Sequence, residues 1–72
     1  MTLGDIKNGD HIRILNIPDE KVRAQAFRFG ISEGASVVCI EKIPKGPVIL
    51  KKNLQELAIG RRLAEKITVE MV

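Results

Sequence analysis

Five segments of the chain carry apolar residues at every second position, which is typical of strands with one face in a core. They cover residues 11–17, 35–43, 48–52, 55–59 and 66–72. Successive side chains of a strand point to opposite sides, so each segment has one set of apolar residues that can face a core. These inward positions are Ile12, Ile14, Val37, Cys39, Val48, Leu50, Leu57, Ile59, Ile67, Val69 and Met71. The pattern predicts a mostly β protein of about five short strands.

Residues 20–29 follow a different period, in which apolar residues return every three or four positions. The stripe consists of Val22, Ala26 and Phe29, and Phe27 widens it. Asp19 is placed to cap the start of a helix, and Gly30 supplies the left-handed residue that ends one. We therefore predict one inserted helix that packs its stripe against the strands. Residues 60–65 break the strand alternation and predict a short helical turn.

The connections between these elements contain turn-forming residues. Asn8-Gly9 is a strong turn signal, and residues 44–47 form a turn rich in Pro and Gly. Leu3 and Ile6, which precede the first strand, are expected to anchor the lead-in segment to the core. Short strands with such turns and one helix favour a small closed barrel. Because a chain of 72 residues has room for one core only, we expect a single domain over residues 1–72.

Composition narrows the class of protein. The net charge of +3 is mild, and both signs are interspersed, whereas nucleic-acid-binding proteins usually carry a denser basic stripe. The single cysteine, Cys39, excludes an internal disulfide and is consistent with a reducing compartment. No apolar run approaches the roughly 20 residues of a transmembrane helix. We expect a cytoplasmic protein that does not insert into a membrane and that reaches one only through a partner.

No set of residues in the sequence has the types and spacing needed for catalysis or for metal binding. His11 lies in a different segment from Ser32 and Ser36, and no phosphate-binding loop is present. A transition-metal site usually needs several His, Cys or carboxylate ligands, and His11 and Cys39 have no suitably spaced companions. An exposed histidine and a buried core cysteine are the simpler interpretations. We therefore expect that the protein is not an enzyme and that it has neither a metal site nor a cofactor.

Several short motifs occur in an order that resembles the FeoA family of small accessory proteins of bacterial ferrous iron transport. They are Leu3-x-x-Ile6 with Gly9, the helix end 29–34, the turn 44–48, the segment 57–64 that reads Leu-Ala-Ile-Gly-Arg-Arg-Leu-Ala, and Ile67-x-Val69. Together they extend over residues 3–71, with Phe29 at a position where the family usually has Leu. The resemblance implies an SH3-like barrel, in agreement with the strand count, and no chemistry of its own.

The resemblance also implies a function and a partner. It suggests a cytoplasmic accessory or regulatory protein that contacts the cytoplasmic part of a FeoB-type, GTPase-driven membrane permease. Two alternatives stay open: a regulatory domain related to the C-terminal domain of iron-dependent repressors, and a small nucleic-acid-binding barrel. The second is disfavoured because the chain has no Tyr or Trp and both Phe residues lie on the helix stripe.

The outward positions of two strands suggest where a partner binds. Val38, Ile40 and Ile49 are apolar where a solvent-facing side should be polar, so either the helix covers them or they form an exposed patch. Lysines of the adjoining hairpin would form its polar rim, unless they are simply a solvated face. An acidic protein surface or an anionic membrane leaflet would suit these lysines better than nucleic acid. The candidate partner-binding residues are Val38, Lys42, Lys45, Ile49, Lys51 and Lys52.

Overall fold

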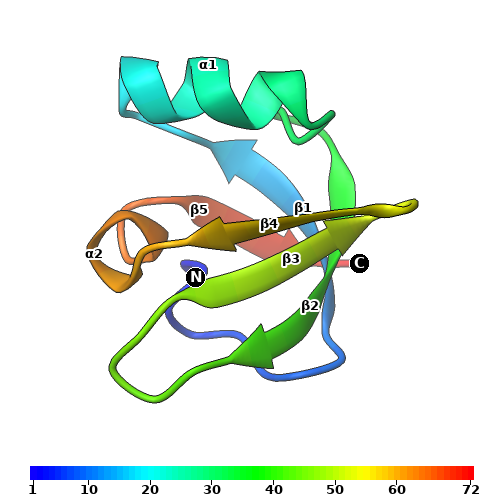
Figure 1. The fold of residues 1–72 in the computed structure, drawn as a ribbon, viewed down its shortest axis with the longest axis vertical. Coiled ribbons are helices and arrows are strands. Elements are labelled where there is room, and N and C mark those ends of the chain that lie inside the picture. The colour runs from blue at the N-terminus through cyan, green and yellow to red at the C-terminus, as the bar shows by residue number, and fades with distance from the viewer.

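The computed structural model describes all 72 residues and consists of five strands and two helices. In chain order they are β1 (His11–Asn16), α1 (Glu20–Arg28), β2 (Ser36–Lys42), β3 (Val48–Lys52), β4 (Gln55–Ile59), α2 (Arg61–Ala64) and β5 (Thr68–Met71). The strands form one antiparallel sheet in the order β4-β3-β2-β1-β5. Figure 1 shows α1 lying across one end of the curled sheet and α2 at its side. The mostly β fold of about five strands with one inserted helix and a short helical turn is confirmed. No strand pairing joins β4 to β5, so these two are the edges of the sheet.

The core is aliphatic and gathers the inward faces of the strands. Its buried residues are Leu3, Ile6, Ile12, Ile14, Ile17, Ala26, Ile31, Val37, Cys39, Val48, Leu50, Ile59, Ala64, Ile67 and Val69. Leu3 and Ile6 are fully buried, which confirms that the lead-in segment is anchored to the core. Thr2 also bridges to Thr68, which places this segment beside β5. The strand alternation therefore identified most of the core correctly.

The two inward predictions that differ both lie on edge strands. Met71 is 52% exposed, and Leu57 is only half-buried. Met71 is the last residue of β5, and no strand lies on the far side of β5. Leu57 is the middle residue of β4, the other edge strand, and lines a groove between this strand and the two helices. Alternation fixes which side of a strand a residue faces, but at a sheet edge that side is only partly covered.

The helix begins as predicted, and its packing needs one correction. The Asp19 side chain accepts hydrogen bonds from the backbone N–H groups of Lys21 and Val22, at 2.9 and 3.0 Å, and so caps the first turn. Ala26 is buried and Val22 packs against the core, but Phe29 is 40% exposed and Phe27 is 71% exposed. The prediction that Phe29 packs into the core is therefore wrong.

Phe29 leaves the apolar stripe because the helix ends one residue before it. Phe29 has φ −102° and ψ 11°, so it no longer follows the helical path. Gly30 then adopts φ +76°, a left-handed conformation that Gly accepts without strain. This turn directs Ile31, which is 1% exposed, into the core in place of Phe29. Neither helix has the length and apolar composition needed to cross a membrane.

Candidate partner-binding surfaces

The lysines predicted to form one cluster lie at two separate ends of β3. Lys51 and Lys52 end the strand, whereas Lys42 pairs with Val48 at its start and Lys45 lies in the loop beyond. At about 3.3 Å per residue, four residues of strand separate the two ends by roughly 13 Å. The hairpin therefore offers two basic regions, and each has its own neighbours.

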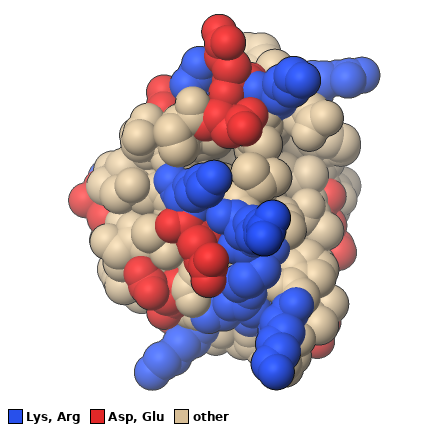
Figure 2. All heavy atoms as spheres, turned by 90° about the vertical axis from the view of Figure 1, so that its left-hand side faces the viewer, with Lys and Arg blue, Asp and Glu red and all other residues tan.

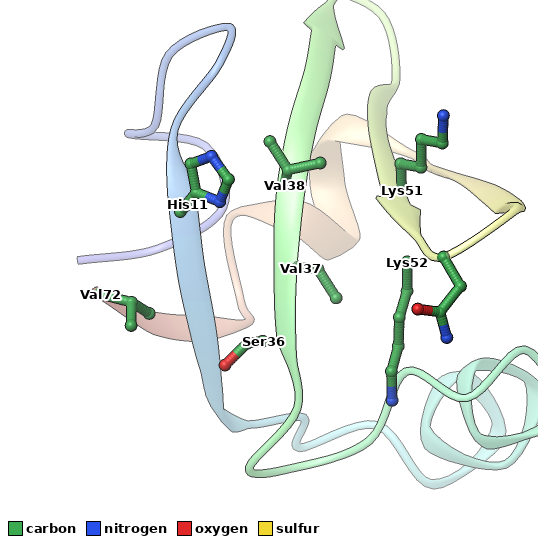
Figure 3. Close-up of a pocket in the computed structure, with 8 residues that line it drawn as sticks. His11, Ser36, Val37, Val38, Lys51, Lys52 and Val72 are labelled. Carbon is green, nitrogen blue, oxygen red and sulfur yellow. The ribbon is translucent and has the colours of Figure 1, made fainter.

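The first region surrounds Val38. Across the sheet, His11 pairs with Val38, Val38 with Lys51, and Lys51 with Glu56, so these side chains follow one another on the outer face. A hollow of about 280 Å³ opens here (Figure 3). Its lining residues are His11, Ser36, Val37, Val38, Lys51, Lys52, Asn53 and Val72. The hollow has an apolar floor with cations at its edge, which is the composition of a small protein contact.

Lys51 and Lys52 play different roles at this hollow. In Figure 3 their side chains point in opposite directions. The Lys52 ammonium donates a hydrogen bond of 2.6 Å to the carbonyl oxygen of Gly30 and thereby ties β3 to the end of α1. Lys51 is exposed and takes part in neither a hydrogen bond nor an ion pair, since the one ion pair of the structure joins Arg13 to Glu70. Of these two lysines, only Lys51 is fully free to meet a partner.

The outward apolar residues of β2 and β3 are partly exposed. Ile40, the extra residue of a β-bulge, is 39% exposed, and Val38 and Ile49 are half-buried. Ile49 lies between Glu41 and Ala58 and does not line the hollow around Val38. The helix does not cover these residues, because α1 packs beside β4 and α2 instead.

The second basic region also contains Arg61, which lies outside the lysine-bearing hairpin in the sequence. Arg61, the first residue of α2, lines a shallow hollow of about 500 Å³ together with Lys42, Pro44, Lys45 and Glu65. The face of the molecule that carries α2 shows Lys and Arg side chains gathered closely, with a few carboxylates among them (Figure 2). No local pattern in the sequence predicted this grouping, because none indicated that α2 returns to the β2–β3 loop.

An apolar groove between α1 and β4 was also missed. It is narrow, about 70 Å³, and its lining includes Val22, Gln25, Ala26, Leu57, Ala58 and Leu63. Its walls come from β4, an edge strand, and from the two helices. The helical spacing of Val22 and Ala26 indicated an apolar face, but it could not indicate which strand that face would meet.

The reactive groups do not assemble into a site. No three His, Cys, Asp or Glu side chains lie close enough to hold a metal ion, and the expectation of no metal site stays a prediction. Cys39 is buried in the core, and this burial raises the pKa of its thiol. A thiol kept protonated in this way is a poor nucleophile and a poor metal ligand. His11 is exposed at the edge of the hollow around Val38.

Comparison with known protein families gives a match over residues 1–71 to the FeoA domain. The chain belongs to the FeoA family. Membership places it among non-enzymatic accessory proteins associated with ferrous iron transport. None of the curated proteins compared with the sequence matches it.

Solved structures share the fold along the whole chain. A crystal structure of FeoA, described as an iron uptake regulatory protein, is 27% identical with a TM-score of 0.85, and the match covers 100% of this chain and 97% of that one. The FeoA protein of Chlorobium tepidum is 28% identical with a TM-score of 0.87, covering 100% and 70%. A FeoA-like protein of Clostridium acetobutylicum, at 23% identity, has a TM-score of 0.78 and covers 100% and 86%. The last of these supports the fold alone.

The motifs that resemble the FeoA family meet one another in space. Arg61, from the segment 57–64, donates hydrogen bonds to the carbonyl oxygens of Gly46 and Ile43 at 3.1 and 2.9 Å. Both carbonyls belong to the β2–β3 loop, and Gly46 lies within the family motif 44–48. The FeoA pattern therefore includes residues that hold α2 against this loop.

Proposed function

We propose that this FeoA-family protein supports ferrous iron uptake in the cytoplasm by binding the cytoplasmic part of a FeoB-type permease through the outer face of β2 and β3. Val38 and Ile49 supply apolar contact area, and Lys51 orients the partner. A relative of 27% identity is described as an iron uptake regulatory protein, which supports a regulatory role in the same process.

The observation that carries the proposal is the hollow around Val38. Its floor is apolar, and Lys51 at its edge has no partner within the molecule. Because Lys51 has no hydrogen bond or ion pair within the protein, it breaks no internal interaction when it binds an acidic group of a partner. Such a charge raises the rate of association, whereas the apolar floor slows dissociation.

Two of the matched structures favour this proposal over the repressor alternative. Those at 27% and 28% identity are described as FeoA, and the first is covered to 97% by this chain. The nucleic-acid alternative was disfavoured partly because both Phe residues were expected on the apolar stripe of the helix. Phe27 and Phe29 are in fact exposed, so this argument no longer holds. The mild net charge still argues against the nucleic-acid alternative.

The test is a pull-down with the purified cytoplasmic part of the permease. Val38→Thr keeps the side-chain shape but adds a hydroxyl, and Lys51→Glu reverses the free charge. The double variant should bind at least tenfold more weakly, which corresponds to about 1.4 kcal/mol. Lys21→Glu on α1, with the same charge change, is the control and should bind as the wild type does. Wild-type binding by the double variant contradicts the proposal, as does salt-sensitive binding of RNA in its place.

A further inference from the structure

The lining of the hollow beside α2 carries more positive than negative charge. Lys42, Lys45 and Arg61 share this lining with a single carboxylate, that of Glu65, and outside it the Asp5 carboxylate lies close enough to Lys42 to interact with its charge. None of these four side chains forms an ion pair, because the only one in the structure joins Arg13 to Glu70. Three cations that share one hollow with a single carboxylate attract anions more strongly than isolated surface lysines do.

Two of the three cations are held in place by carbonyl groups. The Lys42 ammonium donates to the carbonyl oxygen of Gly4 at 2.6 Å, and the Arg61 guanidinium donates to Gly46 and Ile43. A carbonyl fixes a cation without neutralising it. An ammonium has three donors and a guanidinium has five, so both retain free N–H groups for a ligand. Because the side chains are already ordered, binding costs them less conformational entropy.

The third cation is carried by a rigid loop in a disfavoured conformation. Lys45 has φ +58°, which residues other than Gly adopt only at a cost. The loop is closed by hydrogen bonds from Gly46 N–H to Ile43 O at 2.8 Å and from Ile43 N–H to Pro47 O at 3.1 Å. A Cβ on Gly46 would lie only 2.9 Å from the Ile43 side chain, so the loop is also tightly packed. Lys45 is therefore presented to solvent from a fixed backbone.

We propose that the hollow formed by Lys42, Lys45 and Arg61 binds an acidic peptide segment of a protein partner. A carboxylate matches the planar fork of Arg61, and a second carboxylate two residues further along an extended segment, about 7 Å away, meets a lysine. Glu65 repels a dense array of phosphates more than it repels spaced carboxylates, which favours a peptide over a lipid surface. The proposal rests on the proposed function only in assigning this protein a partner.

The test needs no permease. A short, labelled poly-glutamate peptide is titrated into the full chain at low ionic strength, with poly-glutamine of equal length as the uncharged probe. Backbone amide NMR signals of residues 42, 43, 45, 46 and 61–65 should shift with poly-glutamate only, since residue 44 is a proline without an N–H group. Lys45→Glu should weaken binding about tenfold, because it replaces attraction by repulsion, and the difference should shrink as salt is added. Lys45→Gly, which suits the positive φ, removes the charge without straining the loop and should weaken binding about threefold.

The control is Lys21→Glu, an equal charge change on α1, which should alter the affinity by less than about twofold. Equal weakening by Lys45→Glu and Lys21→Glu would show that only net charge matters, and it would overturn the proposal. So would a failure of the wild type to bind poly-glutamate, or binding of phosphatidylglycerol vesicles instead that depends on Lys45. Intact poly-glutamate binding together with a failed permease pull-down would contradict the proposed function alone.

Discussion

The two ends of β3 carry similar lysines but are held in different ways. At the first end, Lys42 and Arg61 together donate three hydrogen bonds to backbone carbonyls, which tie the loop to α2 and to the N-terminal turn. At the second end, Lys52 makes one such bond, Lys51 makes none, and the turn leaves Leu54 96% exposed. We call these the tied end and the open end. A lysine count does not distinguish them, because what matters is whether each ammonium has an internal acceptor.

The largest loss of stability should follow from removing the hydrogen bonds that Arg61 makes at the tied end. Arg61→Ala removes both hydrogen bonds to the loop and leaves two carbonyls without that partner, which should cost about 2–3 kcal/mol of unfolding free energy. Urea unfolding measures it. Arg62→Ala is the matched control, because Arg62 is exposed on the same helix and donates no hydrogen bond; it should stay within about 0.5 kcal/mol. Equal losses for both variants would mean that α2 itself, and not the tie, is affected.

Gly46→Ala should disturb the same end by packing alone. The added methyl would lie 2.9 and 3.2 Å from two atoms of the Ile43 side chain, closer than carbon atoms normally approach. We expect a loss of about 1–2 kcal/mol, measured by thermal or urea unfolding. Gly60→Ala provides the comparison, since no atom lies within 4 Å of its added Cβ and its φ of −56° suits any residue. A Gly46→Ala protein as stable as Gly60→Ala would show that the loop is not tightly packed.

The open end contributes less to stability. Lys52→Met should cost about 1 kcal/mol through the lost bond to the Gly30 carbonyl, whereas Lys51→Met should change the unfolding free energy by less than about 0.5 kcal/mol. Urea unfolding of both variants, side by side, compares two adjacent lysines of the same strand. A loss at Lys51 as large as that at Lys52 would reveal an internal role for Lys51 and weaken its assignment to the partner surface.

The sequence predicted the strands and most of the core because alternation is a local property. The inward orientation of Ile12, Val37 and Leu50 follows from their positions along each strand and can be predicted without knowing which residues surround them. The helix end was harder, because the apolar stripe continues to Phe29 while the backbone leaves the helix at that residue. Phe29→Ala is therefore expected to cost only about 1–2 kcal/mol, less than the 3–5 kcal/mol of a buried Phe.

The candidate sites were less predictable, since they depend on which elements meet. The hairpin placed Lys42 and Lys52 close in sequence, yet both donate to carbonyls from distant segments, those of Gly4 and Gly30. Arg61 joined the basic residues of the tied end only through the return of α2 to the loop. No local pattern contains this information, because it arises from tertiary packing.

The smallest predicted effect tests whether the tied end extends to the N-terminal turn. The Asp5 carboxylate accepts a hydrogen bond of 2.8 Å from the backbone N–H of Thr2, and this bond holds the pKa of Asp5 below its ordinary value of 3.8, with a lesser contribution from the charge of Lys42. Because folding favours the charged form, the resulting stability is present above pH 3.8 and is lost as the pH falls through the lower folded-state pKa. Asp5→Asn should therefore lower the melting temperature slightly at pH 7, and the difference from wild type should vanish in strong acid. Melting curves at both pH values measure it. A difference that persists unchanged in acid would show that the carboxylate charge is not what holds the N-terminal turn beside Lys42.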